Sequence, residues 1–447
     1  MPAQPSLLRR IGLGGAAALV ISNMVGTGIF STTGFLASDL GSPSLVLLSW
    51  LVGGFCALLG AICYSELALN FPISGGEYVY LGRAYGRTWG FIAGWVSLVA
   101  GFSAPIAAAA LAFAGYSSRV FSGRLAPPQV IACCIIALLS ACNLFGIRRG
   151  VRLQNVLTAL KVLLLLAFAA AALLFGQGDW HNFSQPAARS GAASLWQQFA
   201  VSLFWIYVSY SGWNAAAYVA EEIEKPERTL PSALAVGAGS VAVLYLLLNV
   251  VFIFAMPLES MKGVLAVGAL AASRLFGSQI AGAFSLGMTC ALLSTLNAMI
   301  IAGPRVYYAM ARSGDFFSFA ARVHPRWRTP VNAILVQAVC AILLALTPFP
   351  QLVVYIGFTL NLFAVLSVAS LFRFRRQPGW RRLGIVSFAY PLIPSLFIAV
   401  GTWMTVEGFI QKPLISLMTV LTLMLGAGFH RLSRFSRAIP PAIEPRP

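Results

Sequence analysis

The sequence predicts an all-α, polytopic membrane protein with twelve transmembrane helices. Of its 447 residues, 59% are apolar and only 9% are charged, whereas about a quarter of the residues in a soluble domain carry a charge. The apolar residues form long runs, such as residues 156–175, in which Lys161 is the single charged residue. A spanning helix needs about 20 such residues, and continuous runs without alternation exclude a membrane β-barrel. This composition excludes a soluble enzyme, a disordered chain and a nucleic-acid-binding domain.

Proline and glycine residues divide the apolar runs into twelve expected spans. In chain order, these cover about 11–38, 43–70, 85–116, 128–147, 155–176, 195–220, 232–256, 279–311, 331–347, 350–373, 384–405 and 413–430. Turn-forming residues separate them at Gly41-Ser42-Pro43, Pro127-Pro128, Pro226, Pro330, Pro348-Phe349-Pro350, Pro378-Gly379 and Pro413. We therefore expect one membrane domain over residues 1–447, with spans eleven and twelve at about 384–430 and a short tail at 431–447.

The positive charges follow this topology. Twelve spans place both termini on one side of the membrane. If that side is the cytoplasm, the cytoplasmic segments hold 23 of the 30 Lys and Arg residues and the opposite segments hold 6. The remaining one is Lys161, inside span five. Such a bias is typical of cytoplasmic loops, so the net charge of +18 indicates orientation rather than a nucleic-acid partner. The first apolar stretch has no cleavage signal, and we expect it to be retained as span one.

Two spans are interrupted by small and polar residues. Span one contains Ser22-Asn23-Met24-Val25-Gly26-Thr27-Gly28, and span six contains Ser209-Tyr210-Ser211-Gly212-Trp213-Asn214. Small residues in a span can also serve close helix packing. Here, however, each interrupted span opens one of two five-span blocks of similar length, residues 11–176 and 195–373. Because five is odd, the second block is inverted relative to the first, and paired interruptions in inverted repeats indicate a transport site near the bilayer midplane.

Interrupted helices of this kind can bind a small zwitterion. The half-helix that begins at the break presents free N–H groups and the positive end of its dipole to an anion. The half that ends there presents free carbonyl groups to a cation. Exposed backbone is tolerated at membrane depth only around a cavity. Because a carboxylate and a nearby ammonium group match both ends, the sequence indicates the backbone of an α-amino acid as the ligand.

Several motifs resemble those of the amino acid–polyamine–organocation (APC) superfamily of transporters. The resemblance covers nearly the whole chain and is closest to the bacterial L-type-like amino-acid permeases. It rests on Gly26-Thr27-Gly28-Ile29-Phe30 in span one, on Pro72-Ile73-Ser74-Gly75-Gly76-Glu77-Tyr78-Val79-Tyr80 after span two, on Ser211-Gly212-Trp213-Asn214 in span six, and on Glu221-Glu222-Ile223 and Pro226-Glu227-Arg228-Thr229-Leu230-Pro231 in the loop that follows.

The resemblance implies a LeuT/APC-type fold, in which a 5+5 inverted repeat is followed by two C-terminal helices and helices one and six are unwound at the midplane. It also implies secondary active transport of amino acids by alternating access, without cofactor, metal or catalytic residue. The implied substrate-binding groups are the amides of Gly26, Thr27 and Gly28 for the carboxylate, the carbonyls of Met24, Val208 and Ser211 for the ammonium group, and a side-chain pocket that includes Ala93, Gly94, Leu98, Ala298 and Asn361.

Two departures from the family pattern bear on gating and substrate. The family often has an aromatic gate where this chain has Val208, and Phe204, Tyr207 or Tyr210 is the candidate replacement. The pocket positions of span three are apolar, which favours neutral L-amino acids over arginine, agmatine or polyamines. A cationic amino acid or polyamine exchanger of the same fold is the alternative.

The resemblance also bears on partners. Eukaryotic relatives tether an ancillary subunit through a cysteine between spans three and four. Residues 117–127 contain no cysteine, so we expect no disulfide-linked subunit here. The expected partners are the amino-acid substrate and the lipid bilayer.

Lys161 is the one basic residue inside a span. A lysine at the centre of a helix costs about 2.5–3.5 kcal/mol on insertion, so it either snorkels to the interface or faces the bundle. In the second case we expect it to bond carbonyls of the broken first span and the hydroxyls of Ser294 and Thr295 in span eight. Related transporters hold a sodium ion where the resemblance places this lysine, which predicts sodium-independent transport that is either exchange or proton-coupled.

Other classes of function have less support. The seven cysteines lie in apolar runs without metal-ligand spacing, and we interpret them as buried hydrophobic residues. A membrane enzyme would need paired acids, a metal site or an activated nucleophile at depth, and the spans hold almost no acids. Glu66 and Glu77 are expected to pair with loop arginines rather than to carry protons. A non-transporting amino-acid sensor remains open. The expected location is the inner membrane of a bacterium, with cytoplasmic termini.

Overall fold

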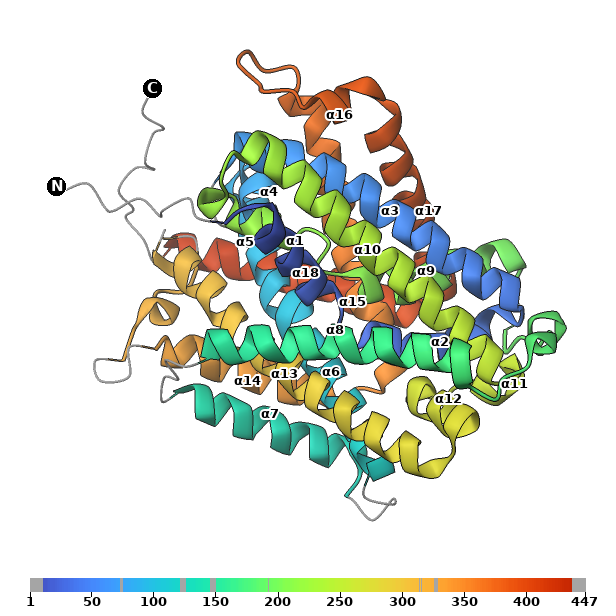
Figure 1. The fold of residues 1–447 in the computed structure, drawn as a ribbon. Coiled ribbons are helices and arrows are strands. Elements are labelled where there is room, and N and C mark those ends of the chain that lie inside the picture. The colour runs from blue at the N-terminus through green and yellow to red at the C-terminus, as the bar shows by residue number, and fades with distance from the viewer. Residues whose placement is uncertain are drawn as a thin grey trace.

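The computed structural model of the protein describes residues 11–72, 75–120, 126–144, 150–191, 193–312, 314, 316–324 and 329–435. In these residues the regular secondary structure is helical, apart from one isolated parallel β-bridge between Ile11 and Ile223. The helices pack side by side in one body, with α1 in its interior (Figure 1). The prediction of an all-α membrane protein is confirmed.

Helices occupy each of the twelve expected ranges. In chain order these are α1 (Leu13–Met24) and α2 (Gly28–Leu40), α3 (Pro43–Asn70), α5 (Arg87–Val96) with the π-helix η1 (Ser97–Ser103) and α6 (Ala104–Val120), α7 (Pro128–Leu144), α8 (Gly150–Phe175), α9 (Leu195–Tyr210) with the 3₁₀-helix η3 (Ala215–Glu222), α10 (Pro226–Ala255), α13 (Ser278–Arg312), α14 (Val331–Ala345), α15 (Phe349–Phe374), α17 (Leu392–Gln411) and α18 (Pro413–Phe435).

Length and hydropathy support membrane spanning for most of these helices. Within the described ranges, seven helices are long and apolar enough to cross a membrane, or eight if α1 and α2 count as one span bent by 46°. Helices α7, α14 and the described part of α8 are apolar but shorter. The chain is therefore a multi-pass membrane protein, while the count of twelve spans and their inverted order remain predictions.

Short helices occupy segments that the sequence analysis left as loops. They are α4 (Glu77–Tyr85), η2 (Trp180–Ser184), α11 (Leu258–Met261), α12 (Val267–Phe276) and η4 (Ser318–Ala321), whereas the short helix α16 (Gly384–Phe388) lies at the start of the expected span eleven. Helix α4 buries Val79, Tyr80, Leu81 and Ala84 and packs against α5 and α15. Amphipathic segments of about ten residues are too short to span, but burying one face on the bundle stabilises them as helices.

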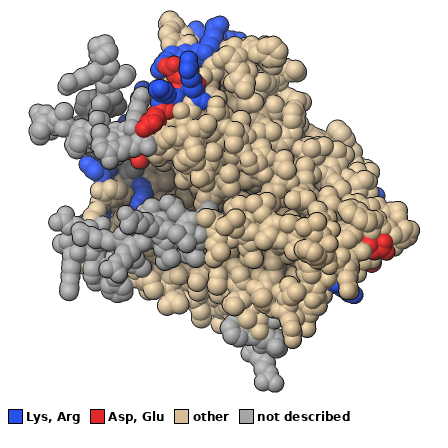
Figure 2. Space-filling view, in the orientation of Figure 1, with Lys and Arg blue, Asp and Glu red and all other residues tan. Residues whose placement is uncertain are grey.

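The outer surface is suited to lipid. Leu163, Leu174 and Phe175 of α8 expose 61%, 73% and 78% of their surface. Figure 2 shows a broad uncharged surface, with most of the visible Lys and Arg side chains at the upper left and a few at the opposite edge. Exposed leucine and phenylalanine at this density would be an aggregation risk in water, but they match hydrocarbon.

The buried interior joins the first helices of the two predicted repeats. Helix α10 packs along both α1 and α3, α2 packs on α9, and α6 packs on α13. The interruptions in α1–α2 and α9–η3 lie where these elements meet. The fold therefore brings together the two segments that the sequence analysis singled out.

Candidate functional site

The first interruption separates α1 from α2. The N–H of Val25 still bonds to the Ile21 carbonyl at 2.9 Å, which closes the last turn of α1, and the Phe30 N–H bonds to the Thr27 carbonyl at 3.2 Å. Thr27 is the N-cap residue of α2, and its side chain accepts no capping hydrogen bond from the first turn. Since the first N–H groups of a helix have no partner within the helix, the start of α2 presents polar backbone toward the break.

The second interruption follows α9. The Ser211 N–H bonds to the Val208 carbonyl at 3.1 Å, and Gly212 then adopts φ +100°, a conformation that glycine adopts at little cost. The chain continues as the 3₁₀-helix η3, and Val219 within it leaves helical geometry. The sixth helix is thus broken after Tyr210, as the sequence analysis predicted.

The two interruptions pack directly against each other. A Cβ atom added to Gly28 would lie 2.3 Å from the Cα of Ser209, and one added to Gly212 would lie 2.8 Å from the carbonyl carbon of Asn23. The hydroxyls of Thr32 and Ser209 form a hydrogen bond of 2.9 Å across the same contact. Glycine is therefore required on both sides, because any side chain would hold the two broken helices apart.

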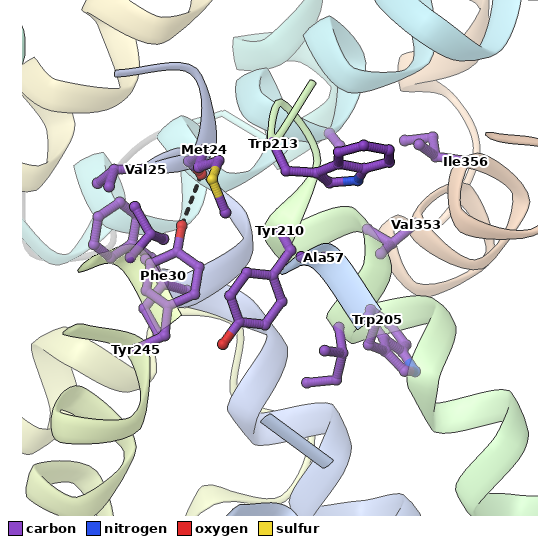
Figure 3. Close-up of a cluster of buried hydrophobic side chains, with 14 of the residues drawn as sticks. Met24, Val25, Phe30, Ala57, Trp205, Tyr210, Trp213, Tyr245, Val353 and Ile356 are labelled. Carbon is purple, nitrogen blue, oxygen red and sulfur yellow. Dashed lines mark hydrogen bonds between the residues drawn. The ribbon is translucent and has the colours of Figure 1, made fainter. Parts of the chain in front are cut away.

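A tyrosine that the sequence analysis missed contacts the first interruption. Tyr245 of α10 donates a hydrogen bond of 2.7 Å to the Met24 carbonyl, shown as the dashed line in Figure 3. One turn further on, Asn249 accepts a hydrogen bond of 2.6 Å from Thr33 of α2. The only sequence signal was a pair of polar residues four apart in the apolar run of α10, which places them on one helix face.

The buried lysine lies beside this region. Lys161 is 4% exposed, and its Nζ atom donates to Thr295 Oγ1 at 3.3 Å. The methyl group of Thr295 would be 3.9 Å from a Cβ atom added to Gly26. Ser294 is also buried, and its hydroxyl has no hydrogen-bond partner among the described residues. The lysine therefore faces the bundle rather than snorkelling, and Thr295 lies between it and the first interruption.

The predicted side-chain pocket residues are spread over three helices. Ala93 and Leu98 are buried, and a Cβ atom added to Gly94 would meet Met310 of α13. Ala298 of α13 is half-buried. Asn361 of α15 donates to the Gly401 carbonyl at 2.8 Å and to Thr405 Oγ1 at 3.1 Å, so its amide is engaged by α17. Their role in a substrate pocket remains a prediction.

The candidate gate residues line one face of α9. Tyr207 donates to the Leu360 carbonyl at 3.3 Å, Tyr210 donates to the Trp50 carbonyl at 3.1 Å, and the Phe204 ring lies 5.4 Å from that of Phe358. Tyr207 and Tyr210 border a cavity of about 30 Å³ between α3, α9 and α17. A cavity of this size holds about one water molecule, so it is too small for an amino acid.

The two acids near the end of span two, Glu66 in α3 and Glu77 at the start of α4, have different partners. Glu66 forms a buried ion pair with Arg375, 2.5 Å from Oε2 to Nη2, and also accepts from Trp380 Nε1 at 2.8 Å. This pairing agrees with the prediction. Glu77 instead accepts hydrogen bonds from the side chains of Tyr64, Asn214 and Tyr218. Over the residues that the structure describes, the prediction of an arginine partner is therefore wrong for Glu77. Within the described part of the chain, no group of three or more His, Cys, Asp or Glu residues could hold a metal ion.

The chain is similar in sequence to known amino-acid transporters. A family model described as amino acid permease matches residues 11–425. The serine/threonine exchanger SteT of Bacillus subtilis (strain 168) is 29% identical over 402 residues, which cover 88% of this chain and 89% of that protein. The large neutral amino acids transporter small subunit 2 of Homo sapiens is 30% identical over 415 residues, covering 88% and 75%. The human Asc-type amino acid transporter 1 is 28% identical over 455 residues, covering 98% and 85%.

Proposed function

The chain belongs to the amino acid permease family, and from this membership we propose that it carries neutral L-amino acids across a bacterial inner membrane by alternating access. Its relatives are transporters, which argues against an enzyme. The observation that carries the proposal is the direct contact of the two helix interruptions at Gly28–Ser209 and Gly212–Asn23. A contact between two broken helices brings polar backbone from both to one place inside an apolar bundle.

We assign the two ends of the substrate to the two kinds of backbone group. The N–H groups of Gly26, Thr27 and Gly28 would bind the carboxylate, because they stand at the positive end of α2. The carbonyls of Met24, Val208 and Ser211 would bind the ammonium group. The Met24 carbonyl already accepts from Tyr245, but a carbonyl oxygen has two lone pairs and can accept a second donor.

The substrate class follows from the apolar positions of span three and from the relatives. Ala93, Gly94 and Leu98 offer no carboxylate to a guanidinium or a second ammonium group. The names of the relatives refer to serine and threonine or to large neutral amino acids. A neutral substrate is therefore favoured over a cationic one.

The coupling mode follows from Lys161. The lysine supplies a fixed positive charge beside Thr295, at the place where the family resemblance puts the sodium ion of sodium-coupled relatives. We therefore propose sodium-independent transport, with exchange or proton coupling as the driving mechanism. Both termini would be cytoplasmic, and no disulfide-linked subunit would be required.

Flux in proteoliposomes tests the proposal. Liposomes loaded with unlabelled serine or leucine are given labelled serine, leucine or arginine outside, with choline in place of sodium. Uptake of serine or leucine that needs internal amino acid supports exchange, and uptake driven by an acid exterior supports proton coupling. Uptake of arginine alone would overturn the neutral class. Binding without any flux would indicate a sensor and overturn transport.

A further inference from the structure

The carboxylate of Glu77 joins three segments of the chain. Its Oε1 atom accepts hydrogen bonds from the Tyr64 hydroxyl at 3.0 Å and from Asn214 Nδ2 at 2.9 Å, and Oε2 accepts from the Tyr218 hydroxyl. Asn214 Nδ2 also lies 3.2 Å from the Tyr218 oxygen. Tyr64 belongs to α3, Glu77 begins α4, and Asn214 and Tyr218 belong to the turn and the 3₁₀-helix η3 after the break in the sixth helix. We refer to these four residues as the Glu77 cluster.

The backbone before Glu77 is shaped to place it there. Gly75 and Gly76 adopt φ +136° and +51°, conformations that a residue with a Cβ atom rarely takes. A Cβ atom added to Gly76 would lie 2.0 Å from Cε1 of Tyr218. The two glycines therefore turn the chain sharply and let α4 begin flat against the tyrosine ring.

The segment that Glu77 holds has weak internal order. A 3₁₀-helix has poorer hydrogen-bond geometry than an α-helix and is uncommon beyond a few residues. Here it runs from Ala215 to Glu222, with Val219 outside helical geometry at φ −116° and ψ 24°. Hydrogen bonds to a charged acceptor are roughly twice as strong as neutral ones. The position of η3 therefore depends on side-chain contacts, and the Glu77 carboxylate supplies the strongest of those within the cluster.

We propose that Glu77 is a positioning residue for transport, whose carboxylate fixes η3 against α3 and α4 so that opening of the site on this side requires release of the Glu77 cluster. The inference rests on the proposed transport function and adds to it a device that controls the second half of the broken sixth helix. The Glu77 cluster is separate from the proposed substrate-binding groups. Those groups lie at Ser211, at Val208 in α9 and at the break between α1 and α2.

Glu77→Gln tests the proposal by two readouts. One is the rate at which a maleimide labels a cysteine introduced at the half-buried Val219 of η3, in purified protein whose seven native cysteines have been replaced. The other is amino-acid exchange in proteoliposomes without the Val219 substitution. Release of η3 predicts labelling at least threefold faster. It also predicts a maximal exchange rate at least fivefold lower, because a carrier that no longer closes on this side cannot complete the exchange cycle. The thermal midpoint should stay close to that of the parent protein. Tyr85→Phe, which removes a hydroxyl that donates to Leu366 outside the cluster, is the matched control and should change neither.

A double-substitution cycle separates positioning from general damage. Tyr218→Phe alone should also speed labelling, and adding it to Glu77→Gln should have less than the summed effect, because both remove the same hydrogen bond. Parent rates of labelling and exchange in Glu77→Gln, or fully additive effects in the pair, would overturn the proposal. If Glu77→Gln does not fold, Tyr64→Phe and Tyr218→Phe carry the same test. If the parent protein moves no amino acid, the transport proposal fails, while the labelling comparison still decides the role of Glu77.

Discussion

Replacement of Gly28 by alanine is the sharpest test of the contact between the two broken helices. The added Cβ atom would lie 2.3 Å from Cα, 2.5 Å from Oγ and 2.6 Å from Cβ of Ser209. Ordinary van der Waals contact begins at 3.4 Å, so α2 and α9 must separate by about 1.1 Å, the difference between 3.4 and 2.3 Å. The closest of these atoms belongs to the backbone of an α-helix, so a rotamer change cannot relieve the overlap.

The expected cost follows from that overlap. Overpacking a closely packed interior costs about 1–3 kcal/mol, and separation also strains the Thr32–Ser209 hydrogen bond, whose net worth is about 1 kcal/mol. If substrate binds to the packed arrangement, a penalty of about 1–3 kcal/mol against that arrangement lowers the apparent substrate affinity roughly 5–150-fold. Gly239→Ala in α10 is the matched substitution outside the assigned site, because a Cβ atom added to Gly239 would meet nothing within 4 Å. It should change affinity by less than roughly threefold.

The assay is saturation of amino-acid exchange in proteoliposomes, with size-exclusion profiles to confirm that both variants fold. We expect Gly28→Ala to raise the half-saturating concentration strongly and Gly239→Ala to leave it near the parent value. A Gly28→Ala protein with parent affinity and rate would refute the claim that the two interruptions must touch for binding.

The remaining predictions use the same flux assay together with thermal unfolding. Lys161→Ala should lower exchange at least tenfold while the protein still inserts and folds, because Thr295 loses its buried cationic partner; parent flux would remove the proposed role of the lysine. Thr27→Val should weaken affinity less than fivefold, because the backbone amide rather than the hydroxyl is assigned to the carboxylate; complete loss of binding would contradict that assignment. Arg375→Ala leaves the Glu66 carboxylate buried without its ion-pair partner, which costs about 3–5 kcal/mol. We expect a markedly lower thermal midpoint in fluorescence-detected unfolding, and an unchanged midpoint would show that the pair contributes nothing.

The sequence predicted the local features of the site because they depend on neighbouring residues. The Gly26-Thr27-Gly28 and Ser211-Gly212 segments combine glycine with polar residues, and glycine costs about 1 kcal/mol relative to alanine in a helix interior. The structure breaks both helices at these segments. Burial of Lys161 was one of two alternatives that the sequence left open, and the structure shows the buried one.

The partners of these residues could not be read from the chain. Tyr245 reaches the Met24 carbonyl, and Glu77 gathers Tyr64, Asn214 and Tyr218, across large separations in sequence. Nothing near Glu77 distinguishes a carboxylate that meets tyrosines from one that meets arginines. The same holds for Asn361, a predicted pocket residue whose amide is engaged by Gly401 and Thr405 of α17.

The sequence by itself therefore determined the membrane setting, the positions of the breaks and the glycines that permit them, because hydropathy and backbone propensity are local quantities. Only the tertiary structure decided which groups meet at the breaks, because helix rotation and packing set which side chain faces which neighbour. A change of one residue in position turns a helical side chain by about 100°. A tyrosine moved by one position along α10 would therefore no longer point its hydroxyl at the first break and could face lipid instead.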